Sequence, residues 1–372
     1  MRSLISRIAI LGVFLLTGCG GAVATTAHTT GSATIVSISA ALTTADDTAS
    51  TASAITTSAP TSSTASSTAT TINSSSASSS ATATATSGSG SQVAATSYPL
   101  TIKDDKGASV TLAAKPTHIV SLVPSNTEIL YAVGAGNDLA AGTQYDDYPP
   151  AAKSKALIKG LKPSLEVVTA YHPDLVLATP SNAADLIQQL QTLHVPVVYL
   201  DAHDFAGVYH DINLVGQIVD AVPAAQQVVA GMQQKVQSVT AQVTAAAPRP
   251  RVFIEVDASD PTKIYTVGPG SFIDAIVTMA GGSNVAHDAK SEYPQLGLEA
   301  LVAADPQIII LNDAAYGSTP AAVAKRPGWT SLTAVKDQKV YPIDDALVSR
   351  PGPRLTDGLV AMAKLIHPEI FK

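Results

Sequence analysis

LEVVTAYHPDLVL, residues 165–177, is matched in register by LEALVAADPQIII, residues 298–310. In each copy a Leu-Glu pair opens a short apolar-periodic run, and a proline stands seven residues after the glutamate. The pattern predicts a short helix that starts at the glutamate, a break at the proline, and then a buried parallel strand. A unit that occurs twice indicates a chain built from two related halves.

The sequence around the first copy alternates between strand and helix patterns, which is typical of a parallel α/β sheet. A turn signal, Asp104-Asp105-Lys106-Gly107, predicts a hairpin within residues 101–112. Short apolar runs predict buried strands at 118–123, 139–143 and 195–200, with a helix around 183–193.

Two serines are placed where helices are expected to begin. Ser125 with Glu128 is typical of a capping box, and Gly134 then ends the helix. Ser271 with Asp274 repeats the arrangement in the second half. The repeated order of elements predicts a pseudo-symmetric pair of lobes.

One long apolar-periodic run, residues 223–247, separates the two halves and predicts a single connecting helix. We therefore expect an N-terminal lobe at 98–222 and a C-terminal lobe at 248–372. In the second lobe the patterns predict strands at 251–256, 264–267 and 339–343, and a closing helix at 357–366.

The first 19 residues, MRSLISRIAILGVFLLTGC, predict a lipoprotein signal peptide. Two arginines precede an apolar run that is too short for a mature membrane span, and the end resembles a bacterial lipobox. Cys19, the only cysteine of the chain, is then the lipidated residue, because the lipid is attached to sulfur. We expect an extracytoplasmic protein anchored to the outer face of the bacterial cytoplasmic membrane.

Residues 20–97 are rich in Ser, Thr and Ala and contain few large apolar residues, which predicts a disordered tether. The formal net charge of −7, without a basic block, argues against a nucleic-acid partner.

Catalytic signatures are lacking: there is no G-x-S-x-G elbow, no phosphate loop and no H-E-x-x-H motif. A hydrolase would need Ser125 or Ser271 as its nucleophile, but a capping role already explains both serines. His203 and His210, with aspartates nearby, could contribute to a metal site, although a solvated loop is the favoured interpretation. We expect a protein that is not an enzyme and holds no metal or cofactor of its own.

Four tyrosines fall in polar loops that follow predicted strands: Tyr145, Tyr148, Tyr265 and Tyr293. Ligands of open α/β sheets bind outside the carboxyl ends of the strands. A tyrosine there offers a flat apolar face and a hydroxyl to a ligand that is large and partly polar. The alternative, that these rings only pack or cap turns, stays open.

Glu166 and Glu299 open the two repeated helices. A carboxylate in the first turn of a helix is stabilised by the helix dipole. One such glutamate on each lobe would also suit basic residues on a two-fold partner. The spacing alone favours neither interpretation.

Seven motifs together resemble the substrate-binding lipoproteins of ABC importers for cobalamin and iron chelates, and most of all the corrinoid-binding members. The resemblance extends over nearly all of residues 98–372. The motifs are VSLVPSNTEILYAVGAG, QYDDYPP, SLEVVTAYHPDLVLA, AGGSNV, YPQLGLEALVAADPQIII, RPGWTSLTAVKDQKVYPID and RPGPRL.

The resemblance implies an α/β fold of two Rossmann-like lobes with parallel sheets, joined by one long rigid helix, with a ligand cleft between the lobes. It implies capture of a corrinoid, with haem or a ferric siderophore as the alternative, and delivery to an ABC permease dimer with its ATPase. Glu166 and Glu299 match the glutamates that dock on arginines of the permease. We expect the binding protein itself to be a monomer.

The residues of the family's ligand pocket are matched only in part by this sequence. Tyr145 matches the tyrosine that lies over the corrin face, and Tyr265 and Tyr293 match positions held by other aromatic residues in the family. Two family tryptophans have no counterpart, because Gly160 and Thr179 stand in their places. Two arginines of the RPGPR motif remain to be assigned: Arg350 could reach the polar edge of a ligand, whereas Arg354 could be structural.

Overall fold

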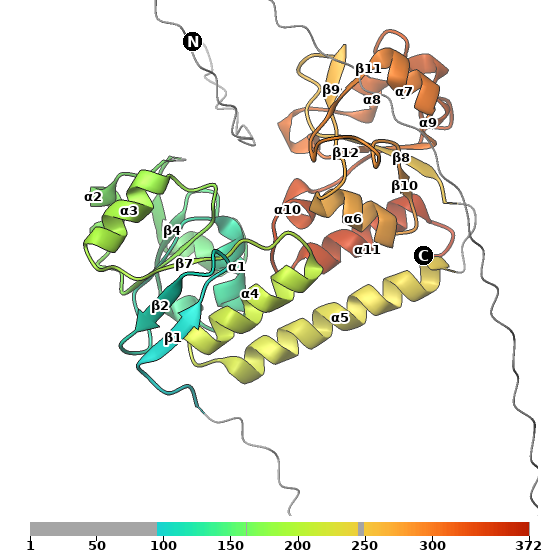
Figure 1. The fold of residues 1–372 in the computed structure, drawn as a ribbon. Helices are drawn as coiled ribbons and strands as arrows, with labels where there is room; N and C mark the ends of the chain where they lie inside the picture. The colour runs from blue at the N-terminus through green and yellow to red at the C-terminus, as the bar shows by residue number, and fades with distance from the viewer. Residues whose placement is uncertain (1–94, 161, 245–248, 372) are drawn as a thin grey trace, which may run out of the picture. The chain divides into compact units, whose positions relative to one another are not determined.

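Two parallel sheets organise the protein in the computed structural model, which describes residues 95–160, 162–244 and 249–371. The predicted signal peptide, Cys19 and nearly all of the 20–97 tether lie outside these residues. The first sheet has the order β5-β4-β3-β6-β7 and the second the order β10-β8-β12-β13 (Figure 1). The prediction of an α/β protein with two parallel sheets is confirmed.

The strands of the first sheet are β3 (Ile119–Ser121), β4 (Leu139–Thr143), β5 (Ala156–Ile158), β6 (Leu175–Ala178) and β7 (Val197–Tyr199). Those of the second sheet are β8 (Arg251–Glu255), β10 (Ser283–Asn284), β12 (Ile308–Leu311) and β13 (Val340–Pro342). Two antiparallel pairs complete the strands: β1 (Leu100–Lys103) with β2 (Ser109–Leu112), which is the predicted hairpin, and β9 (Lys263–Tyr265) with β11 (Gln295–Gly297).

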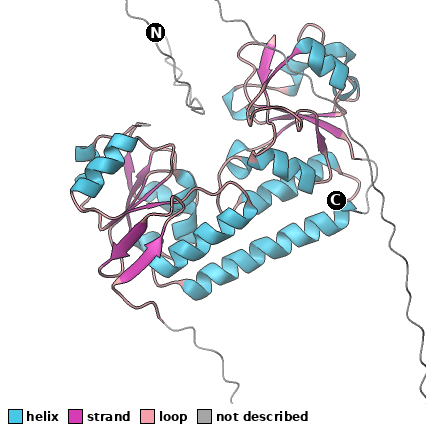
Figure 2. Ribbon diagram, in the orientation of Figure 1, coloured by secondary structure: helices cyan, strands magenta, loops and turns pink. Residues whose placement is uncertain are grey.

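Eleven α-helices occur in the described residues, and the longest of them packs against other helices rather than against a sheet (Figure 2). They are α1 (Pro124–Ala132), α2 (Leu165–Thr169), α3 (Ala184–Thr192), α4 (Phe205–Ile218), α5 (Val222–Thr244), α6 (Phe272–Met279), α7 (Leu298–Ala304), α8 (Pro320–Val323), α9 (Thr333–Lys336), α10 (Asp345–Val348) and α11 (Leu355–Ile366).

The strand order reverses at one point in each sheet. From β3 the chain moves outward through β4 and β5, and then returns to place β6 against the other side of β3. From β8 it moves to β10 and then returns to place β12 against the other side of β8. A crevice therefore opens at the carboxyl ends of β3 and β6, and another at those of β8 and β12.

The duplicated sequence occupies equivalent places in the two sheets. Each copy forms a short helix, α2 or α7, that begins at the leucine before the glutamate, and each then forms the strand, β6 or β12, that returns beside the first strand of its sheet. Both strands are fully buried, as the apolar runs predict.

Helix α5 runs alongside α4 and α11 (Figure 1) and contacts both. The largest core cluster contains side chains of both halves, such as Ile129, Ile212, Ile276 and Leu359, and also Met232 of α5. The prediction of one long helix between the halves is confirmed as far as Thr244, and the predicted residues 245–247 lie outside the described ranges. Among the described residues, no helix is both long and apolar enough to cross a membrane.

The predicted solvated loop around His203 and His210 is wrong, because most of it belongs to helix α4. Asp204 caps this helix by accepting a hydrogen bond of 2.7 Å from the backbone N–H of Gly207. Gly216 lies where α4 meets α5, and any β-carbon there would collide with Ala225. A glycine is required here by the close packing of the two helices.

The predicted capping box at Ser125 and Glu128 is also wrong. Helix α1 begins at Pro124, whose ring fixes a helical φ without needing an N–H partner, and Val123 at the N-cap offers no side-chain bond. The second expected box is half confirmed: Ser271 accepts from the backbone N–H of Asp274, but the Asp274 carboxylate accepts from Asn284 instead of closing the box.

Candidate functional site

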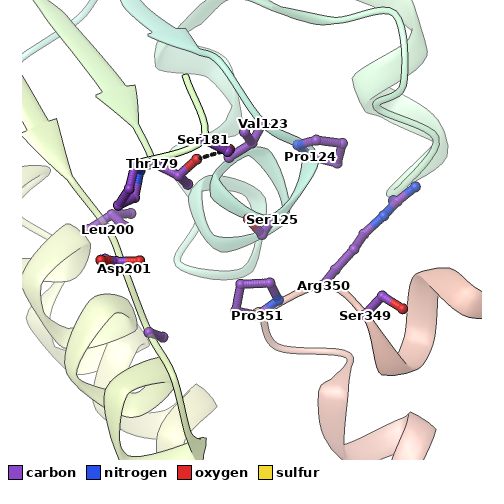
Figure 3. Close-up of a pocket in the computed structure, with 12 residues that line it drawn as sticks. Val123, Pro124, Ser125, Thr179, Ser181, Leu200, Asp201, Ser349, Arg350 and Pro351 are labelled. Carbon is purple, nitrogen blue, oxygen red and sulfur yellow. Dashed lines mark hydrogen bonds between the residues drawn. The ribbon is translucent and has the colours of Figure 1, made fainter. Parts of the chain in front are cut away.

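A cavity of about 320 Å³ lies at the reversal point of the first sheet (Figure 3). Three of its walls follow the carboxyl ends of β3, β6 and β7, at residues 123–125, 179–181 and 200–202. The fourth wall, 349–351, comes from the second half of the chain. The cavity thus combines the ligand-binding edge of one sheet with a segment of the other half.

The lining mixes apolar and polar groups, as a site for a partly polar ligand requires. Val123, Leu200 and Pro351 supply apolar surface. The hydroxyls of Thr179 and Ser181 lie 2.6 Å apart and are hydrogen-bonded, as the dashed line in Figure 3 shows.

An ion-pair network joins the two halves at one side of the cavity. Glu128 of α1 is 3% exposed and accepts from Arg354 Nε at 2.9 Å, from Arg354 Nη2 at 2.6 Å and from Arg350 Nη1 at 3.1 Å. Arg350 also donates both Nη groups to Asp147, at 2.5 and 3.2 Å. These bonds fix the 350–354 segment against the first half.

The network also shifts the pKa values of Asp147 and Arg354. Burial alone would raise the pKa of Asp147, but the hydrogen bond and positive charge of Arg350 outweigh it, and the pKa is lowered. The hydrogen bond to Glu128 raises the pKa of Arg354. Arg354 also lies over the ring of Tyr148, 4.2 Å from its centre, so its predicted structural role agrees with its contacts.

Of the five side chains predicted to contact a ligand, Arg350 alone lines the cavity. Tyr145 and Tyr148 lie in the loop after β4, which is held by the buried Asp146 through bonds of 2.5 Å from Thr127 and from Thr143. The ring of Tyr148 is 44% exposed.

Tyr265 and Tyr293 lie close to each other in the second half. Tyr265, on β9, pairs with Gln295 of β11, two residues after Tyr293. Burial and the charge of Glu292 raise the pKa of Tyr293 to about 12, although the residue is 40% exposed. These two rings form a separate group from the residues that line the cavity.

Tyr316 was missed by the sequence interpretation, although it meets the same criterion as the four selected tyrosines. It follows buried strand β12 in the polar loop NDAAYGS, and it is 59% exposed. Its hydroxyl donates to Asp345 Oδ2 at 3.4 Å. Glu128 and Asp147 were missed as well, and no local signal identifies them, because their arginine partners lie more than 200 residues away.

The two glutamates that open the repeated helices are both exposed, each in the first turn of its helix. A hydrogen bond from Ser164 and one from its own backbone N–H lower the pKa of Glu166. Glu166 and Glu299 therefore present carboxylates at equivalent positions of α2 and α7. Their role in docking stays a prediction.

Behind the cavity wall at 200–202, the side chain of Asp211 is buried next to that of Asp105. Asp211 is 2% exposed, and burial followed by the hydrogen bond and charge of Asp105 raises its pKa to about 9. Asp105 in turn accepts from the backbone N–H of Asp201 at 2.6 Å. His203 and His210 are exposed beside these groups, and no cluster of three metal-ligand side chains occurs within the described ranges.

We expect the Asp211→Asn variant to lose a pH dependence of stability that the wild type has. The raised pKa means that folded Asp211 holds a proton that the unfolded chain releases above about pH 4, so the wild type loses stability as the pH rises from about 4 to 9. One proton corresponds to about 1.4 kcal/mol per pH unit. Urea unfolding of both proteins at pH 5, 6.5 and 8 measures this, and equal slopes would contradict it.

A protein-family profile described as "Periplasmic binding protein" matches residues 119–347, which contain both sheets. The chain belongs to the periplasmic binding protein family. Members of this family related to iron-chelate and vitamin B12 import are substrate-binding proteins and not enzymes, and this periplasmic binding protein is therefore the substrate-binding component of an ABC importer.

Three relatives illustrate the similarity of this periplasmic binding protein. An uncharacterised ABC transporter substrate-binding lipoprotein of Bacillus subtilis, YvrC, is 36% identical over 74% of this chain and 88% of its own. A cobalamin-binding protein of Halobacterium salinarum is 28% identical over 73% of this chain and 75% of its own. The solved structure of a possible iron-binding protein from Staphylococcus epidermidis has a TM-score of 0.62 at 29% identity, covering 68% of this chain and all of that one.

Proposed function

We propose that this protein captures a corrinoid and delivers it to the permease of an ABC importer. The observation that carries the proposal is the cavity at the reversal point of the first sheet, whose far wall is supplied by the other half of the chain. Its location suits a ligand held between two lobes. Relatives named as cobalamin-binding and vitamin B12-binding proteins support the corrinoid as the ligand.

The size of the cavity bears on how such a ligand is held. At about 320 Å³ it lies at the lower end of the range for small-molecule sites. A macrocycle would therefore enter it by one edge, with Arg350 at its polar substituents. The remaining surface of the ligand would lie against the tyrosines, with Tyr145 over its face.

A haem or a ferric siderophore is the second candidate, and one lining residue favours it. Thr179, which the family resemblance places where a tryptophan usually stands, is part of the cavity wall. A small polar side chain there removes a stacking surface for a corrin and leaves room for a ligand of another shape.

Titration of the purified protein with cyanocobalamin, haemin and ferric siderophores distinguishes these ligands. We expect cyanocobalamin to bind most tightly, as followed by its absorbance and by calorimetry, and Tyr145→Ala to weaken that binding. Tight binding of haemin without any response to a cobalamin would refute the corrinoid proposal and favour the second candidate.

The location of the protein and the division of its chain are inferred as well. We infer that Cys19 carries the lipid and holds the protein at the outer face of the membrane, with residues 20–97 as the tether. The lipoprotein from B. subtilis supports this arrangement. Lobe boundaries at 98–222 and 248–372, with the connecting helix between them, and a monomeric state belong to the same proposal.

A further inference from the structure

Tyr316 is the most exposed of the large apolar and aromatic side chains in the described residues, yet its position is fixed. The ring is 59% exposed, while the hydroxyl donates to Asp345, which opens helix α10. Arg350 follows the end of this helix, and its positive charge acts on the Tyr316 hydroxyl. An exposed aromatic side chain is thus bonded to the helix that leads to Arg350, the arginine that lines the cavity.

A buried polar cluster anchors the loop that carries Tyr316. Glu255, at the carboxyl end of β8, is completely buried and accepts both Nη groups of Arg326, one of them at 2.7 Å. Ser318 Oγ lies 3.1 Å from Glu255 Oε1 and 2.7 Å from Asp313 Oδ2. Asp313 and Ser318 are the two ends of the loop, so the cluster ties both ends to the second sheet.

The number of available protons determines which atoms donate in these bonds. The Ser318 hydroxyl has one proton and cannot donate to two carboxylates at once. A protonated Asp313 satisfies every contact, since its O–H donates to Ser318 Oγ and the Ser318 hydroxyl donates to Glu255. Asp313 is 7% exposed and its Oδ1 has no partner, which a neutral acid tolerates better than a buried carboxylate.

The charges around Asp313 agree with this assignment. The facing groups are Glu255 of β8 and Ser318 of the loop, while the nearest cation of the cluster, Arg326, is already bound to Glu255. Burial and then the charge of Glu255 raise the pKa of Asp313 to about 6. Asp313, Ser318 and Glu255 thus form a hydrogen-bonded relay. Asp313 holds the proton of this relay below about pH 6 and loses it above.

We propose that Tyr316 is a ligand-contacting residue of the C-terminal half, and that Asp313, Ser318 and Glu255 are positioning residues for it. The inference rests on the proposed function and deepens it. The ligand face that meets Tyr316 is flat and apolar, because the side chain is exposed while its hydroxyl is already bonded. The ligand edge nearby carries polar or anionic groups that suit Arg350.

Binding measurements on Tyr316→Ala and Tyr316→Phe test the contact. For whichever of the three chelate classes the wild type binds best, we expect Tyr316→Ala to raise Kd about tenfold and Tyr316→Phe to raise it less. Leu193→Ala removes an equally exposed apolar side chain, 54% exposed after α3, and should leave Kd unchanged. A Tyr316→Ala Kd within twofold of wild type overturns the contact. If no chelate of the three classes binds the wild type, the proposed function fails and this inference fails with it.

A second measurement tests the relay without any ligand. Trp329 is the only tryptophan of the chain, is buried, and lies under Arg326 at 4.6 Å, so its fluorescence reports on the Glu255–Arg326 pair. We expect a fluorescence transition near pH 6 in the wild type and none in Asp313→Asn, whose amide N–H replaces the acid proton. As the pH rises across the same range, Kd should increase several-fold in the wild type and stay constant in Asp313→Asn. Fluorescence and Kd that are flat from pH 5 to 7 in the wild type overturn the positioning role.

Discussion

Replacing Glu128 by alanine is expected to lower the free energy of unfolding by about 3 to 5 kcal/mol, the usual cost of removing one partner of a buried ion pair. Glu128 is almost completely buried and receives three N–H groups from Arg350 and Arg354. Without Glu128, both guanidinium groups stay largely buried, and Asp147 is the one carboxylate of the network left to compensate their positive charge. Urea unfolding monitored by circular dichroism measures the change.

Two further variants separate the effect of burial from that of charge. Asp147→Asn removes a carboxylate that is 51% exposed, and we expect it to cost no more than about 1 kcal/mol. Glu128→Gln keeps the shape of the side chain but removes its charge, so it should resemble the alanine variant more than Asp147→Asn. Equal stabilities of Glu128→Ala and Asp147→Asn would show that the network contributes little.

The double variant Glu166→Ala/Glu299→Ala is expected to abolish ligand uptake while leaving ligand affinity intact. The two carboxylates stand in the first turns of α2 and α7, and neither residue lines the cavity. If they meet arginines on a two-fold permease, their loss removes both charge-assisted contacts without touching the ligand. Uptake by cells that carry the permease and calorimetry on the purified protein measure the two quantities separately.

A matched control is available on another helix of the first half. Asp185 is an exposed acid in the first turn of α3, the same helical context as Glu166. We expect Asp185→Ala to leave uptake at the wild-type rate. Normal uptake by the double glutamate variant would leave the two residues with a helix-dipole role alone.

Local patterns predicted the parts of the fold that local physics determines. The proline and apolar run of each repeated copy define α2 with β6 and α7 with β12, because helix termination and strand burial depend on neighbours in the sequence. The helix between the halves was found for the same reason, since its apolar residues recur at helical spacing over 23 residues.

The errors arose where a distant contact decides the role of a residue. Ser125 with Glu128 looks like a capping box until two arginines from the far end of the chain bind the glutamate. Tyr316 could have been selected from its loop, whereas the Asp313–Ser318–Glu255 relay could not, since Glu255 lies 63 residues from Ser318.

The pairing of Glu128 with Arg350 and Arg354 spans 222 and 226 residues of chain. Contacts of such separation form late, because a long loop must close before they can stabilise anything. In a chain that is synthesised from its N-terminus, residues 349–351 are added after the whole of the first half, and they supply the final wall of the cavity. The cavity is therefore complete only when residues 349–351 have joined the first half. A site of this kind cannot be assembled from the first half alone.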